Sequence, residues 1–338
     1  MRAVLNTALA AQAAGKGDRA RRAWWRGRLG TILRRNWLLP VALAALAAHP
    51  AQAQNRSLFA GADPDIEVAD GRYWIYPTGG EGLAAWSSSD KTQWKREEPL
   101  IRLKDIAWVR NDRAPIHFLW APDMVQANGG WFFYYSVGPQ NPTPSRIGVA
   151  VCKGPAGPCT DSGKPLVNDG GNGFEAIDPA VFVDPKTKTP YLYAGGSAGR
   201  KLRVWVLKPD MVSIDHEVPV ETPPNFTEGA FMHVRNGVYY LSYSAGQWNH
   251  GNYQVHYAVA LSPTGPWRYG GALLQADKTF KGPGHHSFFT DPKDGQSYIV
   301  YHRWEHVAGN GPYDGERRVA IQKIAYRDDG AILPIKMN

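Results

Sequence analysis

Five polar side chains able to carry protons begin five similar segments of this chain. Four are carboxylates and one is an imidazole: Asp63, Asp123, Asp178, Glu228 and His285. The steps between them are 60, 55, 50 and 57 residues. Carboxylates that gather in one site repel one another and raise some of their pKa values, which is costly to keep without a use. Two carboxyl groups with well-separated pKa values can serve as an acid and a base.

The surroundings of these residues suggest which carboxyl group takes which role. Glu228 has Gly229 and apolar residues beside it, and its longer side chain reaches further into a cleft, so we expect it to be the protonated acid. Asp63 is expected to stay ionised as the base, and Asp178 to keep Glu228 protonated by like-charge repulsion. Glycoside hydrolysis is one reaction that needs such a pair. No catalytic role is indicated for Asp123, and we interpret it as a turn or network residue.

The segments around these residues repeat one pattern. Each has a polar start, an apolar strand, a turn and an aromatic strand, and a second hairpin follows it, as in residues 146–167 and 253–274. Four short strands per step of about fifty residues are typical of propeller blades. The sequence therefore predicts an all-β fold, a five-bladed β-propeller. A two-sheet sandwich is the alternative, but it would not explain five similar units.

A propeller also explains how distant residues could act together. The innermost strand of every blade runs along the central axis, so the starts of the five segments would meet at one mouth of that axis. The same radial packing buries the aromatic faces of each sheet against the next, which accounts for the 12% aromatic content without a cofactor.

The positive net charge does not indicate a nucleic-acid partner. The chain carries +8 overall, but residues 1–54 hold nine cations and one anion, so the remainder holds 29 charges of each sign. A basic surface for phosphates is not indicated for the main part of the chain.

The first residues have the order of a secretory signal. Arg34 and Arg35 precede an apolar run at residues 37–48, and Ala51-Gln52-Ala53 has the small-x-small form of a cleavage site. The run is too short to span a bilayer of about 30 Å, although an uncleaved anchor is the alternative. We predict an export segment at residues 1–53, a catalytic domain at 54–338, and a periplasmic or extracellular location with no membrane attachment of the mature chain.

The two cysteines are Cys152 and Cys159, on either side of a Gly-Pro-rich turn. They offer too few ligands for zinc, and their spacing matches no redox motif. In an exported protein we predict a disulfide between them; two free thiols packed as small hydrophobes are the alternative.

Short motifs in these segments resemble glycoside hydrolase family 43 and its clan of five-bladed propellers. The resemblance extends from Asp63 to the turn at residues 328–330. It rests on motifs in the order of the blades: Asp63-Pro64, Trp120-Ala-Pro-Asp123, Ile177-Asp-Pro179, Glu228-Gly229 and Gly284-His285-His286-Ser287.

The resemblance implies an inverting glycosidase that cleaves arabinan, xylan or related pentose glycans. Asp63 would be the general base, Glu228 the general acid and Asp178 the modulator of the acid's pKa, with the acid and base about 6.5–9.5 Å apart. Trp120 would stack on the sugar, and Arg317 or Arg318 would bind it; we favour Arg318.

Two histidines complete the predicted site. His302 is expected to line the mouth and contact substrate. The resemblance places His285 beside a structural calcium ion held mostly by water, while a hydrogen-bonding role beside the base is equally open. No cofactor is expected to be required.

The substrate is the least determined feature. Tyr301-His-Arg303 resembles α-L-arabinofuranosidases and β-xylosidases, which we favour, and Trp120-Ala-Pro-Asp123 resembles endo-arabinanases. A non-catalytic sugar-binding propeller would not need three carboxylates. Sialidases need an arginine cluster, and fructan-cleaving relatives usually carry Asn-Asp-Pro-Asn-Gly, whereas this chain has Ala62-Asp-Pro-Asp65.

Overall fold

In a computed structural model, residues 57–338 are described, and they form five antiparallel sheets of four strands each. The predicted five-bladed β-propeller is confirmed. No α-helix occurs in residues 57–338, where the only helical turns are the 3₁₀ segments η1 (Leu103–Asp105) and η2 (Val109–Asp112). The predicted export segment, residues 1–53, lies outside the described residues.

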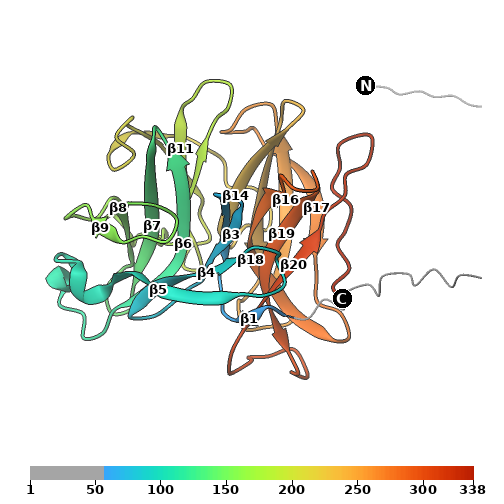
Figure 1. Cartoon of the computed structure of the whole chain (residues 1–338), viewed down its shortest axis with the longest axis horizontal. Coiled ribbons are helices and arrows are strands. Elements are labelled where there is room, and N and C mark those ends of the chain that lie inside the picture. Colours follow the sequence, from blue (N-terminus) through green and yellow to red (C-terminus); the bar gives the residue numbers. More distant parts are fainter. Residues whose placement is uncertain (1–56) are drawn as a thin grey trace, which may run out of the picture. The chain divides into compact units, whose positions relative to one another are not determined.

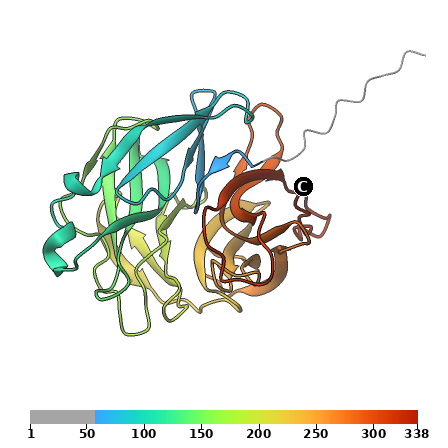
Figure 2. The same ribbon diagram turned by 90° about the horizontal axis from the view of Figure 1, so that it is seen from below.

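The blades follow one another in chain order around a centre, as the colours from blue to red show (Figure 2). Figure 1 labels most of their strands. From the innermost strand outward, the first three blades are β2 (Asp65–Ala69), β3 (Arg72–Tyr76), β4 (Gly82–Ser88) and β5 (Lys95–Arg102); β6 (Phe118–Ala127), β7 (Gly130–Gly138), β8 (Arg146–Cys152) and β9 (Cys159–Asp161); and β10 (Ala180–Val183), β11 (Pro190–Ala194), β12 (Arg203–Leu207) and β13 (Ile214–Val218). The last two are β14 (Glu228–Arg235), β15 (Val238–Ala245), β16 (Gln254–Ala260) and β17 (Arg268–Leu274); and β18 (Phe280–Thr290), β19 (Ser297–Glu305), β20 (Arg318–Lys323) and β1 (Phe59–Ala60).

Local turn chemistry fixes the first hairpin of three blades. Asp70-Gly71, Asn128-Gly129 and Asn236-Gly237 each have two consecutive residues with positive φ. That conformation suits Asn or Asp followed by Gly, and it gives the two-residue turn whose twist matches that of the strands. In these three blades the pairing of the inner strand with the next strand is therefore encoded locally.

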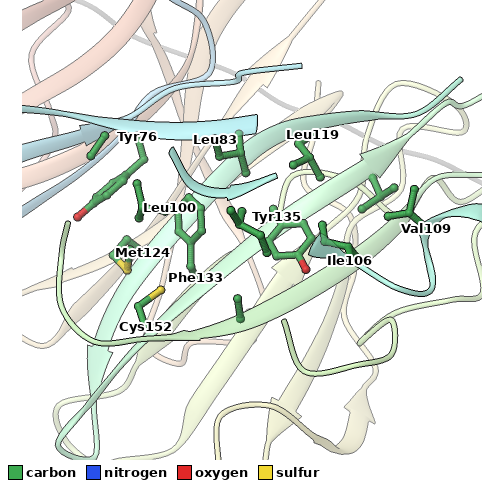
Figure 3. Close-up of a cluster of buried hydrophobic side chains, with 14 of the residues drawn as sticks. Tyr76, Leu83, Leu100, Ile106, Val109, Leu119, Met124, Phe133, Tyr135 and Cys152 are labelled. Atoms are coloured by element: carbon green, nitrogen blue, oxygen red, sulfur yellow. The ribbon is translucent and has the colours of Figure 1, made fainter. Parts of the chain in front are cut away.

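The cores lie between blades rather than at the centre. Each of the five buried clusters joins the facing sides of two neighbouring blades. Figure 3 shows the cluster between blades 1 and 2, where Tyr76 and Leu83 of the first meet Phe133 and Tyr135 of the second. Burying such side chains contributes about 1.5–3 kcal/mol each, so the inter-blade contacts hold the inner strands in place.

The N-terminal strand closes the ring. β1 pairs antiparallel with β20 as the outermost strand of blade 5, and Phe59 stacks on Trp86 of blade 1 at a centroid distance of 4.0 Å. Blade 5 thus combines the first and last strands of residues 57–338. Because the segment at Phe59 has a structural role, cleavage beyond it would remove the closing strand.

Cys152 and Cys159 are joined in a disulfide whose Cα atoms lie 4.0 Å apart. They face each other where β8 ends and β9 begins. None of the helices in residues 57–338 has the length and apolar character needed to cross a membrane.

Candidate active site

Five residues with positive φ lie just before or within the inner strands, and hydrogen bonds between blades join them in a ring. They are Asp63, Ala121, Asp178, Gly229 and His285, with φ between 41° and 60°. In β6, β14 and β18 they sit at β-bulges, where the strand register shifts. A bulge redirects a side chain that strand alternation would have placed elsewhere.

Hydrogen bonds from each blade to the next hold this ring. The backbone N–H of each ring residue donates to a side chain of the preceding blade. The acceptors, in blade order, are His302 Nδ1, Thr78 Oγ1, Ser136 Oγ, Asp178 Oδ2 and Ser244 Oγ, at 2.8–3.1 Å. The ring is therefore tied to the blade contacts that build the fold.

The ring corrects our expectation that Asp123 and Glu228 occupy equivalent starts. Asp123 lies two residues after Ala121, and Glu228 lies one residue before Gly229. Asp123 matches Asp65 instead: each accepts a backbone N–H of the following blade at 2.9 Å, and both line a cavity of about 370 Å³. A one-residue offset turns a side chain to the other face of a strand. Glu228, one residue before the ring position Gly229, therefore points in a different direction from a side chain at the ring position.

Asp63 is held at both of its carboxylate oxygens. Its Oδ1 accepts a hydrogen bond from Arg317 Nη1 at 2.8 Å, and its Oδ2 accepts one from Thr78 Oγ1 at 2.7 Å. His285 Nδ1 lies 3.4 Å from Oδ1. Burial alone would raise the pKa of Asp63, but the Arg317 charge, followed by the two histidines, outweighs it and holds the pKa well below 3.8. Asp63 is thus kept ionised.

Arg317, rather than Arg318, belongs to this site. Arg318 Nε donates to Ser57 Oγ at 3.2 Å and pairs in β20 with Ala60. This corrects our choice of Arg318: the two residues adjoin where β20 begins, so their side chains leave on different sides. The Arg317 guanidinium lies 4.8 Å from the ring centroid of Trp248, which packs beneath it.

Glu228 is buried and held by two donors. Tyr253 OH donates to Oε1 at 2.8 Å, and the backbone N–H of Ser197 donates to Oε2 at 3.2 Å. Burial raises the pKa of Glu228 above 4.5; the Tyr253 hydrogen bond opposes this, and the Asp63 charge adds to it. Gly284 makes room for Tyr253, because a Cβ at position 284 would lie 2.0 Å from the phenol ring.

Asp178 connects the other two carboxylates. Its Oδ2 accepts the backbone N–H of Gly229, beside Glu228, at 3.1 Å, and lies 3.6 Å from His285 Nδ1. That same His285 nitrogen approaches Asp63. Burial, followed by the charges of Glu228 and Asp63, raises the pKa of Asp178 well above 3.8. Asp178 and Glu228 therefore act as a coupled pair beside an ionised Asp63.

His302 supports the site from behind. Its side chain is fully buried, its ring stacks on Tyr253 at 5.7 Å, and its Nδ1 accepts the Asp63 N–H. Burial, followed by the Arg317 charge, lowers its pKa to about 4. The prediction that His302 contacts substrate is wrong, because no part of its side chain reaches the surface; it positions Asp63 instead.

His285 lies at the site, with 13% of its side chain exposed, and burial lowers its pKa below 6.5. Calcium prefers six to eight oxygen ligands. Within residues 57–338 no group of three or more His, Cys, Asp or Glu side chains could hold a metal ion. The side chains of these residues thus do not form a calcium cage.

Trp120 adjoins residues that bind Asp63 and Asp178. The next residue, Ala121, donates its N–H to the Thr78 hydroxyl that also binds Asp63, and Trp120 pairs in the sheet with Ser136, whose Oγ binds Asp178 N. Its ring lies flat over Gly138, where a Cβ would come within 2.1 Å. The half-buried indole is placed to offer an apolar face at the mouth.

Sequence reasoning missed four contributors: Thr78, Ser197, Trp248 and Tyr253. Thr78 and Trp248 brace Asp63 and its arginine, whereas Ser197 and Tyr253 bind Glu228. None belongs to a motif that we used. Of these four residues, only Tyr253 stands at a recognisable place in the repeat, because it begins the second hairpin of blade 4.

Comparison with known proteins places this geometry in context. The profile of glycosyl hydrolases family 43 matches residues 58–332. The β-D-galactofuranosidase xynD of Aspergillus niger is 32% identical over 335 residues, covering 89% of this chain and 93% of that protein. Xylosidase/arabinosidase 43A of Humicola insolens is 28% identical, with 81% of this chain and 96% of that protein covered.

A similar solved structure is the β-xylosidase/α-arabinofuranosidase CoXyl43 from a compost microbial metagenome, in complex with xylotriose and in a calcium-free form. It is 25% identical, has a TM-score of 0.68, and covers 84% of this chain and 97% of its own.

Proposed function

Since this chain belongs to glycosyl hydrolases family 43, whose members it matches over nearly all described residues, we propose that it is an α-L-arabinofuranosidase or β-xylosidase that acts with inversion. Its partner would be an arabinose- or xylose-containing glycan. The observation that carries the proposal is the placement of two buried carboxyl groups in opposite surroundings: Arg317 and Thr78 bind Asp63, whereas Tyr253 and Ser197 bind Glu228. The pKa of Asp63 is accordingly lowered and that of Glu228 raised.

The proposed reaction uses these two groups in one step. Asp63 accepts a proton from water, the water oxygen bonds to the anomeric carbon, and the bond to the leaving oxygen breaks as Glu228 gives that oxygen its proton. Arg317 and Thr78 keep Asp63 in place, and Tyr253 and Ser197 hold Glu228. Trp120 supplies an apolar face for the sugar ring.

A substrate panel tests this proposal. We expect hydrolysis of para-nitrophenyl α-L-arabinofuranoside or β-D-xyloside to exceed that of β-D-galactofuranoside and of debranched arabinan. The galactofuranoside is included because of the similarity to the A. niger enzyme. Preference for debranched arabinan would favour an endo-arabinanase, and no hydrolysis of any of these would favour a sugar-binding propeller. The anomeric form of the first product, followed by proton NMR, reports inversion.

The coupling of Asp178 with Glu228 predicts a pH effect. Activity should fall on the alkaline side as Glu228 loses its proton, and the acid limb should lie below pH 3.8 because the pKa of Asp63 is lowered. The charge of Glu228 raises the pKa of Asp178, so the two carboxyl groups oppose each other's ionisation. Asp178→Asn removes this interaction, and we expect the alkaline limb of kcat/KM to move to lower pH, on the order of one unit. The amide oxygen can still accept the Gly229 N–H. An alkaline limb that stays in place or moves upward would contradict this role.

We also propose that a calcium ion near His285, if bound, is structural and not needed for the chemical step, because an acid and a base suffice for inversion. Removing metals with a chelator should lower activity or the melting temperature only modestly. Loss of all turnover, restored by added calcium, would show that the ion is essential.

We propose that the protein acts outside the cytoplasm. The Cys152–Cys159 disulfide supports this, since such bonds persist mainly in oxidising compartments.

A further inference from the structure

Two loops from neighbouring blades are joined through their backbones. One connects β15 with β16 in blade 4, and the other connects β19 with β20 in blade 5. The N–H of Gly251 donates to the carbonyl oxygen of Asn310 at 2.9 Å. The N–H of Tyr313 donates to the carbonyl oxygen of Asn249 at 2.6 Å. We call the contact formed by these four residues the loop clasp.

The side chain of Tyr313 packs inside the blade 5 loop. It is buried, its OH donates to the carbonyl oxygen of Gly309 at 2.8 Å, and its ring centroid lies 5.7 Å from that of the buried Trp304. The two loops approach each other closely, since a Cβ at Gly311 would lie 2.5 Å from the carbonyl oxygen of Asn249. A larger residue at position 311 would therefore push the loops apart.

A chain of ring contacts connects the loop clasp with the arginine that binds the base. Trp304 Nε1 donates to the carbonyl oxygen of Trp248 at 3.1 Å, and the two rings lie 6.1 Å apart. Trp248 lies in the blade 4 loop against Arg317, whose Nη1 donates to Asp63 Oδ1 at 2.8 Å. A guanidinium over an indole ring is attracted to it. Tyr313 is thus linked to Arg317 through two tryptophans.

The backbone of Arg317 is held in a different way. Its carbonyl oxygen accepts the N–H of Gly61 at 2.9 Å, so a second contact fixes the start of β20. The guanidinium ends a flexible side chain, which loses conformational entropy when it is held in one position. Loosening the loop clasp should therefore release the Trp248 indole and the guanidinium while β20 stays in place.

We propose that Tyr313 is a positioning residue for hydrolysis: through the loop clasp it holds the Trp248 indole against Arg317, and so keeps the guanidinium on Asp63. The inference rests on the proposed function, to which it adds a residue that acts from outside the carboxylate cluster. A guanidinium at a carboxylate favours the ionised form. The other titratable side chains around Asp63 are His285 and His302 of blade 5, Asp178 of blade 3 and Glu228 of blade 4.

Tyr313→Ala tests the proposal through the acid limb of kcat/KM, measured on the panel substrate that the wild type cleaves best. The pKa of Asp63 is lowered in the wild type, so the limb should rise by about one unit when the guanidinium is released. Tyr313→Phe keeps the ring and should stay near the wild type. Arg317→Ala should raise the limb at least as far, and adding Tyr313→Ala to it should raise it no further.

Tyr239→Ala is the matched control. Tyr239 is about as buried as Tyr313, and its OH donates to Asp184 Oδ1 at 2.9 Å. It lies near the start of β15, at the end of blade 4 away from Glu228. This variant should lower the melting temperature and leave the acid limb in place. An equal rise in Tyr239→Ala and Tyr313→Ala, no rise in Tyr313→Ala, or a further rise in the double variant with Arg317→Ala would overturn the role.

A second variant and a second measurement separate the remaining outcomes. If Tyr313→Ala does not fold, Gly311→Ala opens the same loop clasp and should give the same rise. Carboxyl carbon NMR follows the titration of Asp63 without substrate, and the signal is assigned by its loss in Asp63→Ala. If the wild type cleaves no substrate of the panel but Asp63 titrates at higher pH in the variant, the proposed function fails and the positioning role stands. An unchanged titration would contradict the role.

Discussion

Glu228→Gln is expected to slow hydrolysis of an unactivated pentose oligosaccharide by about 10²–10⁴-fold, because an amide cannot give a proton to the leaving oxygen. The shape of the side chain is retained, and the carbonyl oxygen can still accept the Tyr253 hydrogen bond. The loss should therefore appear in kcat rather than in folding. On an aryl glycoside with a good leaving group the loss should be much smaller, since that bond breaks with little help from an acid.

Glu175→Gln is a suitable control for this variant. Glu175 is another buried carboxylate, three residues before Asp178, and it accepts the backbone N–H of Ser145 at 2.7 Å. A glutamine oxygen can keep that bond, so activity on both substrates should stay near that of the wild type. Equal losses on the oligosaccharide and the aryl glycoside in Glu228→Gln would argue against its role as the acid.

Asp63→Ala is expected to abolish nearly all turnover, by about 10³–10⁴-fold, whatever the leaving group, because the carboxylate that takes the proton from water is lost. Independence from the leaving group distinguishes the base from the acid. The alanine also leaves space for a small anion. Adding azide should then restore part of the rate and give a glycosyl azide of inverted configuration, which proton NMR identifies.

The fold of this variant needs a separate check, because Arg317 loses its partner. Circular dichroism and a melting curve serve for this. Asp123→Asn is the matched control: Asp123 is another buried carboxyl group, and an asparagine oxygen can still accept the Val181 N–H. Asp123→Asn should keep wild-type activity. A fully active Asp63→Ala would remove Asp63 as the base.

Much of the architecture could be predicted from the sequence because the signals are local and repeated. Asp-Gly or Asn-Gly between two apolar runs specifies a tight hairpin, as at Asn128-Gly129 and Asn236-Gly237. Repetition of the pattern every fifty to sixty residues determined the number of blades. Radial packing of equal units then requires Asp63, Asp178 and Glu228 to approach one axis, although 165 residues separate the first from the last.

The tertiary structure alone decided which side chain at each segment start enters the site. Alternation along a strand predicts directions only while the strand is regular, and the bulges at Ala121, Gly229 and His285 interrupt it. For that reason the sequence placed Asp123 among the equivalent segment starts, and its match with Asp65 emerged only from the inter-blade hydrogen bonds.

Three other features have the same cause. They are the choice between Arg317 and Arg318, the burial of His302, and the contacts of Tyr253 and Ser197. Each depends on how one blade or loop meets another, and such contacts leave no periodic trace in the chain. The sequence by itself determined the carboxylates and the framework that gathers them. The packing of neighbouring blades decided their partners, and with them the opposite pKa shifts of Asp63 and Glu228, because burial and nearby charges set a pKa only once the chain is folded.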